Sequence, residues 1–357
     1  MADLFDKIIS IENLFVAWKE FRSGKRHKSD VRIFERNLEE NLFSLRESLI
    51  TGTYQHGIYS SFYINDPKAR SIQKAEVVDR VLHHAIYRIL YPLFDKSFIS
   101  DSYSCRLDKG THNAVNRLEY FARKVSQNYT CPCFALKCDV KKFFASVNHR
   151  LLKNIIRKKI EDEDVIWLLN EIISSFPLDS PAGPNRERER ERERERSCLR
   201  QESLFSRKGI PIGNLTSQLF ANIYLNELDV FIKHNLRAKY YVRYCDDFVI
   251  LSRDRDYLND LIAKITDFLE SKLQLSLHEN KIEIRKLHQG IDFLGYVVLP
   301  GCKIMRSKTK RRMLRKVDKT NESSYLGLLK HCKGYKLEKK VKVLARLSAS
   351  HKYRRPD

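Results

Sequence analysis

Residues 240–251, YYVRYCDDFVIL, decide the fold, because they place the pair Asp246-Asp247 between two apolar runs. β-branched and aromatic residues on both sides of the acids predict a strand, a tight turn and a second strand. Two adjacent acids in an apolar hairpin are costly to bury unless positive charge meets them. The alternative is a solvent-exposed turn, where aspartate is common. No Gly or Asn follows the pair, as the usual two-residue hairpin turns require, which weakens this alternative.

A third carboxylate ends another expected strand. Residues 134–139, FALKCD, alternate as a strand does and put Asp139 at its end. Nucleotidyl transfer needs two divalent cations, one to lower the pKa of the attacking 3′-hydroxyl and one to stabilise the leaving pyrophosphate. Such hard cations prefer oxygen ligands. Asp139, Asp246 and Asp247 are therefore the candidate catalytic and metal-binding residues.

Helical and strand-like segments alternate along the rest of the chain. The spacing of apolar residues predicts helices over 30–50, 76–94, 113–123 and 215–231, and strands over 59–63 and 291–299. Together with the hairpin, this alternation predicts an α+β fold with a mixed or antiparallel sheet.

The composition favours a nucleic-acid partner. Lys and Arg number 67 against 45 Asp and Glu in 357 residues, a formal net charge of +22 that attracts polyphosphate chains. A ribosome-associated basic protein would show the same excess. The eight cysteines are scattered, and Cys131-Pro132-Cys133 alone is weak as a zinc site. The absence of a signal-peptide pattern and of any membrane-length apolar run predicts a cytoplasmic location and no membrane partner.

A strict alternation of Arg and Glu runs from Arg186 to Arg196. In a helix this run would place like charges at i,i+4 and unlike charges at i,i+3, so the unfavourable and favourable side-chain interactions nearly cancel. The run could contact RNA, or it could be a repeat expansion tolerated in a surface loop, since lengthening a loop costs little closure entropy. The low complexity of the segment favours the expansion.

Five blocks of this sequence, in order, resemble those of reverse transcriptases. FALKCDVKKFFASVNH (134–149) is similar to their first catalytic block and RYCDDFVIL (243–251) to their Y-x-D-D block. Residues 209–229 resemble the block that lines the nascent base pair, 66–115 the fingers block of bacterial enzymes related to group II introns, and 279–299 the blocks that close the palm.

This resemblance implies a right-hand polymerase. We expect an N-terminal extension over 1–29, fingers over 30–105, and a palm with an antiparallel sheet over 106–149 and 209–300. Residues 150–208 would be an insertion that holds the Arg-Glu loop (about 179–205), and 301–357 a short, basic helical thumb on the template–primer duplex. Implied ligands are two Mg²⁺ ions, which Mn²⁺ can replace, dNTPs, template RNA and the RNA–DNA duplex.

The middle block narrows the resemblance. Where most group II relatives carry Pro-Gln-Gly, this chain has Pro211-Ile212-Gly213, followed by Asn214 and by Ser217-Gln218. Gly-Asn-x-x-Ser-Gln resembles the enzymes of diversity-generating retroelements, which copy a template-repeat RNA and misincorporate opposite adenine. The resemblance implies an error-prone enzyme in mutagenic retrohoming, with a small accessory RNA-binding protein. The side chain of Ile212 cannot make the polar contact with the incoming nucleotide that a glutamine could make. We expect this loss to reduce the free-energy difference between correct and incorrect nucleotide insertion.

Further roles follow from the same resemblance, position by position. Val140 would offer its backbone carbonyl to a metal ion, and Phe144 would be the aromatic gate that excludes a 2′-hydroxyl, although Phe143 competes for that role. The remaining nucleotide-binding candidates are Arg70, Lys74 and Arg80 on the triphosphate, Ile212, Gly213 and Gln218 in the middle block, and Lys281 as a general acid for pyrophosphate.

Two other functions stay open at this point. A related bacterial reverse transcriptase in a retron-like or phage-defence system would carry the same blocks. A non-catalytic RNA-binding protein could retain the polymerase fold, but the three intact aspartates argue against that reading.

Overall fold

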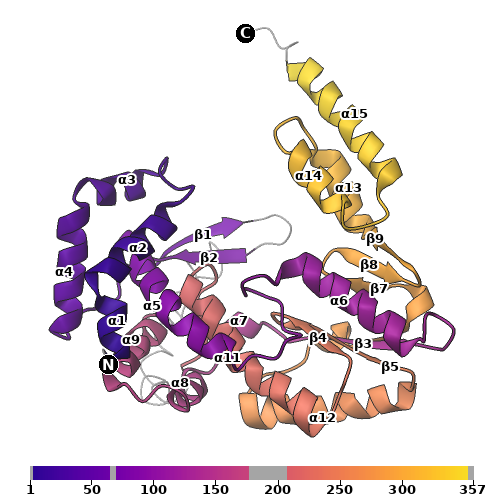
Figure 1. The fold of residues 1–357 in the computed structure, drawn as a ribbon, viewed down its shortest axis with the longest axis horizontal. Coiled ribbons are helices and arrows are strands. Elements are labelled where there is room, and N and C mark those ends of the chain that lie inside the picture. The colour runs from indigo at the N-terminus through magenta and orange to yellow at the C-terminus, as the bar shows by residue number, and fades with distance from the viewer. Residues whose placement is uncertain (1–2, 65–69, 177–206, 353–357) are drawn as a thin grey trace, which may run out of the picture. The chain divides into compact units, whose positions relative to one another are not determined.

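The computed structural model describes residues 3–64, 70–176 and 207–352 (Figure 1). The chain forms two compact units, each made of three segments. Unit 1 comprises Met1–Ile99, Lys141–Asp229 and Phe268–Ser276, and unit 2 comprises Ser100–Val140, Val230–Asp267 and Leu277–Asp357.

Unit 1 is mainly helical. Its central helix α5 (Val77–Asp95) packs against α2 (Ile11–Arg22) and buries Val81, Leu82 and Ile86 completely. An antiparallel hairpin, β1 (Ser60–Ile64) and β2 (Arg70–Lys74), precedes α5. The other helices are α1 (Leu4–Ile9), α3 (Ser29–Arg36), α4 (Leu38–Ile50), α7 (Phe143–Ser146), α8 (His149–Arg157), α9 (Glu163–Ser174) and, except for its last residue, α11 (Leu215–Val230).

Unit 2 is built on an antiparallel sheet of order β4-β5-β3-β6. Its strands are β3 (Phe134–Asp139), β4 (Tyr241–Tyr244), β5 (Asp247–Ser252) and β6 (Glu283–Lys286). Apolar side chains of helix α6 (Gly110–Val125), such as Leu118 and Ala122, share one core with Val242 and Val249 of the sheet. This core fixes the strands whose ends bear the acids.

The second sheet of unit 2 leads into the C-terminal helices. It consists of β7 (Ile291–Phe293), β8 (Tyr296–Leu299) and β9 (Cys302–Met305), all antiparallel. Helices α13 (Ser307–Lys316), α14 (Glu322–Leu329) and α15 (Tyr335–Lys352) follow and share a small core of their own. The long helix α12 (Arg255–Leu273) begins in unit 2 and ends in unit 1. Short helical turns lie at Phe231–Asn235, Glu279–Lys281 and Leu287–Gln289.

The α+β class with antiparallel sheets is confirmed, as are the strand over 134–139 and the hairpin over 240–251. Helices also lie where the sequence predicts them around 76–94, 113–123 and 215–231. The boundaries of fingers, palm and thumb stay a prediction, and the Arg-Glu run lies outside the described residues. Within the described part of the chain, no helix is both long and apolar enough to cross a membrane.

The single helix predicted over 30–50 is wrong. The chain breaks at Asn37 (φ −116°, ψ 42°) into α3 and α4. Asparagine competes with the backbone for hydrogen bonds and favours helix ends. The side-chain amide of Asn41 donates to the carbonyl of Phe34 (3.1 Å), which satisfies one acceptor that the end of α3 leaves open.

The single strand predicted over 291–299 is also wrong. It is the hairpin β7–β8, because Leu294 and Gly295 both have positive φ (51° and 88°) and reverse the chain. Two such residues form the turn that matches strand twist in a two-residue hairpin loop. Gly295, inside an apolar run, was the available signal.

Gly290, which precedes β7, tests how tightly this sheet packs. Its φ is +85°, and an added Cβ would lie 2.6 Å from Cγ1 of Val297, so Gly290→Ala is expected to destabilise the fold by about 1–3 kcal/mol. Gly327→Ala is the control, because Gly327 lies in α14 with open space at the Cβ position and helical alanine stabilises by about 0.5–1 kcal/mol. Thermal unfolding should separate the two variants, and equal melting temperatures would contradict the packing described.

Candidate active site

Three carboxylates gather at one edge of the four-stranded sheet. Asp139 and Asp247 are directly opposite in the β3–β5 register, so their side chains share a face. Tyr244 pairs with Asp247, which leaves Cys245 and Asp246 as a two-residue loop between β4 and β5. The backbone N–H of Val140 donates to the carbonyl of Asp246 (3.1 Å) and ties the loop to the end of β3.

The loop is strained, and a buried arginine supports it. Cys245 has a φ of 55°, unusual for a residue other than glycine. The guanidinium of Arg243 is fully buried and donates to the carbonyl of Cys245 (3.1 Å) and to Oγ of Ser102 (3.0 Å). Sequence reasoning missed Arg243, although a lone arginine in an apolar strand was visible. Burial and the charge of Asp246 raise the pKa of the Cys245 thiol, which keeps it protonated beside the acids.

The three acids oppose one another electrostatically. Burial, followed by the charge of Asp139, raises the pKa of Asp246. Burial also raises the pKa of Asp247 to about 6, where the charges of Asp139 and Asp246 add to the effect and Lys137 counters it. Such mutual repulsion is what a bound cation relieves.

Lys281 places a positive charge in direct contact with Asp139. Its ammonium donates to both carboxylate oxygens of Asp139, at 2.8 and 2.6 Å. The sequence placed Lys281 near the triphosphate as a general acid, and the structure places it on a candidate metal ligand. In the described residues, no three His, Cys, Asp or Glu side chains stand in metal-holding geometry. The donor set nevertheless suits a hard divalent cation, because three repelling carboxylates lie together and displacing Lys281 frees Asp139.

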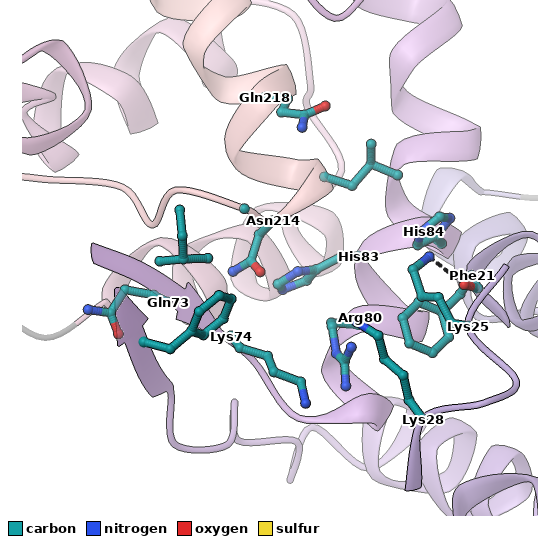
Figure 2. Close-up of a pocket in the computed structure, with 14 residues that line it drawn as sticks. Phe21, Lys25, Lys28, Gln73, Lys74, Arg80, His83, His84, Asn214 and Gln218 are labelled. Carbon is teal, nitrogen blue, oxygen red and sulfur yellow. Dashed lines mark hydrogen bonds between the residues drawn. The ribbon is translucent and has the colours of Figure 1, made fainter. Parts of the chain in front are cut away.

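A second group of candidates lines a pocket in unit 1 (Figure 2). The end of α2 and the loop after it, β2, α5 and the start of α11 all contribute to it. Four of the residues that the sequence singled out lie here, namely Lys74, Arg80, Gly213 and Gln218. The described lining also includes Lys25 and Lys28 and contains no acidic side chain. The pocket is therefore suited to an anionic group.

The middle block runs along β2 at this pocket. The N–H of Gln73 donates to the carbonyl of Ile212 (3.4 Å), and Gly213 follows with a φ of 117°. A Cβ on Gly213 would come within 3.1 Å of Cγ2 of Ile72, so glycine suits both the dihedral and the space. Asn214 is buried, and its carbonyl accepts from the N–H of Gln218 (3.4 Å).

Four nucleotide-binding candidates do not belong to the described lining of this pocket, namely Lys281, described above, and Arg70, Ile212 and Phe144. Arg70 is exposed at the start of β2, opposite Ile64. Ile212 is half-buried beside the pocket. Phe144 is also half-buried, 5.4 Å from the ring of Phe143 between centroids. Phe143 is 1% exposed, as a core aromatic is, which leaves Phe144 as the more accessible ring.

Sequence reasoning also missed Asp30 and a polar network that includes the pocket residue His83. Oδ2 of Asp30 accepts from Nζ of Lys74 (2.7 Å) and from the guanidinium of Arg80 (2.6 Å). In the network, Nε2 of His83 lies 3.3 Å from Nε2 of His56, whose Nδ1 donates to the carbonyl of Gly57 (2.7 Å). Burial, and then the neighbouring His56, His84 and Arg80, lower the pKa of His83 well below its usual value.

Comparisons with known proteins show the family of this chain. Residues 65–298 match the family model described as Reverse transcriptase (RNA-dependent DNA polymerase). Protein YkfC of Escherichia coli (strain K12) is 24% identical over 298 residues, which cover 74% of this chain and 72% of that protein. Group II intron-encoded protein LtrA of Lactococcus lactis subsp. cremoris is 22% identical over 339 residues, which cover 77% of this chain.

The chain spans 51% of the length of LtrA, about half of that protein. Nuclear intron maturase 1, mitochondrial, of Arabidopsis thaliana is 22% identical, and 42% of its length is covered. Among solved structures, apo telomerase from Candida tropicalis is similar with a TM-score of 0.47 and 12% identity, over 73% of this chain and 59% of that one.

Removing the internal counter-charge tests the acid cluster without an activity assay. Lys281→Met is expected to lower the melting temperature of the metal-free protein at neutral pH, by roughly 2–4 °C per kcal/mol of stability lost. It should also enlarge the rise in melting temperature that Mg²⁺ or Mn²⁺ produces. The raised pKa of Asp247, about 6, means that the folded state binds this proton more tightly than the unfolded chain. The penalty of the variant should therefore shrink as the pH falls through that value.

Lys281→Arg, which keeps the charge, is the matched control for this experiment. A metal-induced gain of the same size in Lys281→Met, Lys281→Arg and the unsubstituted chain would contradict the role given to Lys281.

Proposed function

We propose, from the premise that this chain belongs to the reverse transcriptase (RNA-dependent DNA polymerase) family, that it is an RNA-directed DNA polymerase using two-metal nucleotidyl transfer. The observation that supports this activity most is the register of β3 and β5. It sets Asp139 opposite Asp247 with Asp246 in the adjoining loop, so carboxylates from separate strands meet at one edge.

Asp139, Asp246 and Asp247, with the backbone carbonyl of Val140, would hold two Mg²⁺ ions, and Mn²⁺ shares their preference for oxygen ligands. Ions bound there lower the pKa of a 3′-hydroxyl and neutralise charge that develops on the phosphates. Lys281, whose ammonium donates to Asp139, would be the residue that gives a proton to pyrophosphate.

The pocket of unit 1 supplies the phosphate-binding groups of this proposal. Lys74 and Arg80 would hold the triphosphate of a dNTP through charge-assisted hydrogen bonds, with Arg70 at the other end of β2. Phe144 would act as a steric filter against ribonucleotides. The net charge of +22 favours a template RNA and the RNA–DNA duplex as partners, held through their phosphates.

A primer-extension assay tests the activity. With an RNA template, a DNA primer, dNTPs and Mg²⁺, Asp246→Asn is expected to reduce incorporation roughly a hundredfold or more, the scale of losing one electrostatic stabiliser of a transition state. Asp260→Asn, the same change at an exposed position of α12, should retain activity. Equal incorporation by the two variants would rule out the polymerase function.

We further propose that the enzyme is error-prone and serves mutagenic retrohoming, with a small accessory protein that binds it and its RNA. The support is the sequence Gly213-Asn214 with Ser217-Gln218, preceded by Ile212. The carbonyl of Ile212 is bonded to β2, but its apolar side chain offers a nucleotide no hydrogen bond of its own. Correct and incorrect geometries at this position then differ less in free energy.

Ile212→Gln is expected to reduce misincorporation opposite template adenine by roughly fivefold, because one net hydrogen bond contributes about 1 kcal/mol. Ile212→Leu, which stays apolar, is the control and should keep the original error spectrum. Sequencing of the cDNA products measures both. An unchanged spectrum in Ile212→Gln would remove Ile212 as the cause of low fidelity.

A further inference from the structure

The charge around the pocket of unit 1 is balanced by a residue outside its lining. Four basic side chains and no acidic one are among the described residues that line it. Asp30, in the first turn of α3, compensates two of these cations, because it pairs with Lys74 and Arg80. In Figure 2 these two cations extend into the same part of the pocket, and Asp30 is not drawn.

A single oxygen of Asp30 makes both contacts. Oδ2 accepts from Nζ of Lys74 at 2.7 Å and from a terminal nitrogen of Arg80 at 2.6 Å. A phosphate oxygen bound by a lysine and an arginine accepts from them over the same short distances. A phosphate oxygen that bound both cations would therefore make the same two contacts that Oδ2 makes.

Arg80 is fixed independently of Asp30. Its Nε donates to the carbonyl of Glu76 (3.3 Å), and its guanidinium lies 4.9 Å from the ring centre of Phe21. Burial by itself would raise the pKa of Asp30, but the hydrogen bonds and charges of Lys74 and Arg80 lower it to about 2. Asp30 is thus fully ionised at neutral pH, and its pairing with the two cations is strong enough to outweigh its desolvation.

We propose that Asp30 is an internal competitor of the ligand, holding Lys74 and Arg80 until a phosphate group displaces it. One oxygen position cannot hold two anions, so the two states exclude each other. The apparent affinity for phosphate is then reduced by the fraction of chains in which Asp30 has released the cations. The identity of the ligand rests on the proposed function, whereas the competition is a property of the pocket.

The same helix provides a matched control. Glu35 of α3 also pairs with two cations, Arg22 (2.5 Å) and Arg26 (3.2 Å), and neither belongs to the described lining of the pocket. Asp30→Asn and Glu35→Gln therefore make the same change in net charge on one helix. Only the first frees cations that line the pocket.

Isothermal titration of the full chain with inorganic tripolyphosphate, without divalent metal, tests the competition. Asp30→Asn is expected to bind about tenfold more tightly than the unsubstituted chain, and Glu35→Gln to stay within about twofold of it. Asp30→Ser repeats the test should the asparagine variant fold poorly. Adding Lys74→Met to Asp30→Asn should abolish the gain.

Three results would overturn the proposal. Weaker binding of tripolyphosphate by Asp30→Asn would mean that Asp30 positions the cations for the ligand. An equal gain in affinity in Glu35→Gln would mean that only the overall electrostatic field of the protein had changed. Titration with a dNTP and with a single-stranded oligoribonucleotide identifies the source of the phosphate. If Asp30→Asn binds neither of them more tightly than the unsubstituted chain does, the proposal is overturned as well. Failed primer extension alongside a gain in tripolyphosphate affinity would reject the polymerase function and leave the competition standing.

Discussion

The repulsion among three carboxylates at one sheet edge is the constraint on which the rest of unit 2 depends. The β3–β5 register forces Asp139 and Asp247 together, and burial deprives them of the water that would screen their charges. The chain compensates with Lys281 on Asp139 and with the charge of Lys137 near Asp247, while the buried Arg243 supports the loop through the Cys245 carbonyl. The two lysines offset part of the repulsion that these acids bring to an apolar sheet.

The acid cluster of unit 2 and the pocket of unit 1 each neutralise part of their charge with an ion pair inside the chain. In unit 2 a cation covers a carboxylate, Lys281 on Asp139, and in unit 1 a carboxylate covers two cations, Asp30 on Lys74 and Arg80. Each pair occupies groups that the proposed reaction needs. Ligand binding is then an exchange of partners, in which the cost of breaking one ion pair offsets part of the gain from the new contact.

The sequence was most informative where the signal is local. Alternation over 134–139 and 240–251 predicted the strands and put the acids at their ends, because a strand's period is visible in its own side chains. It failed at Leu294, where a leucine takes a positive φ that its side chain does not announce. It also missed Asp30, since the pairing with Arg80 spans 50 residues of sequence and arises only when α3 packs near α5.

The two-residue loop between β4 and β5 has a consequence for how this protein can evolve. Side chains alternate between the faces of a sheet, so one inserted or deleted residue in β3, β5 or the loop would turn a carboxylate to the opposite face. A conservative apolar substitution at Val242 or Val249 leaves this alternation intact, whereas a change of length does not. The length of this hairpin is therefore constrained as strictly as the presence of its two aspartates.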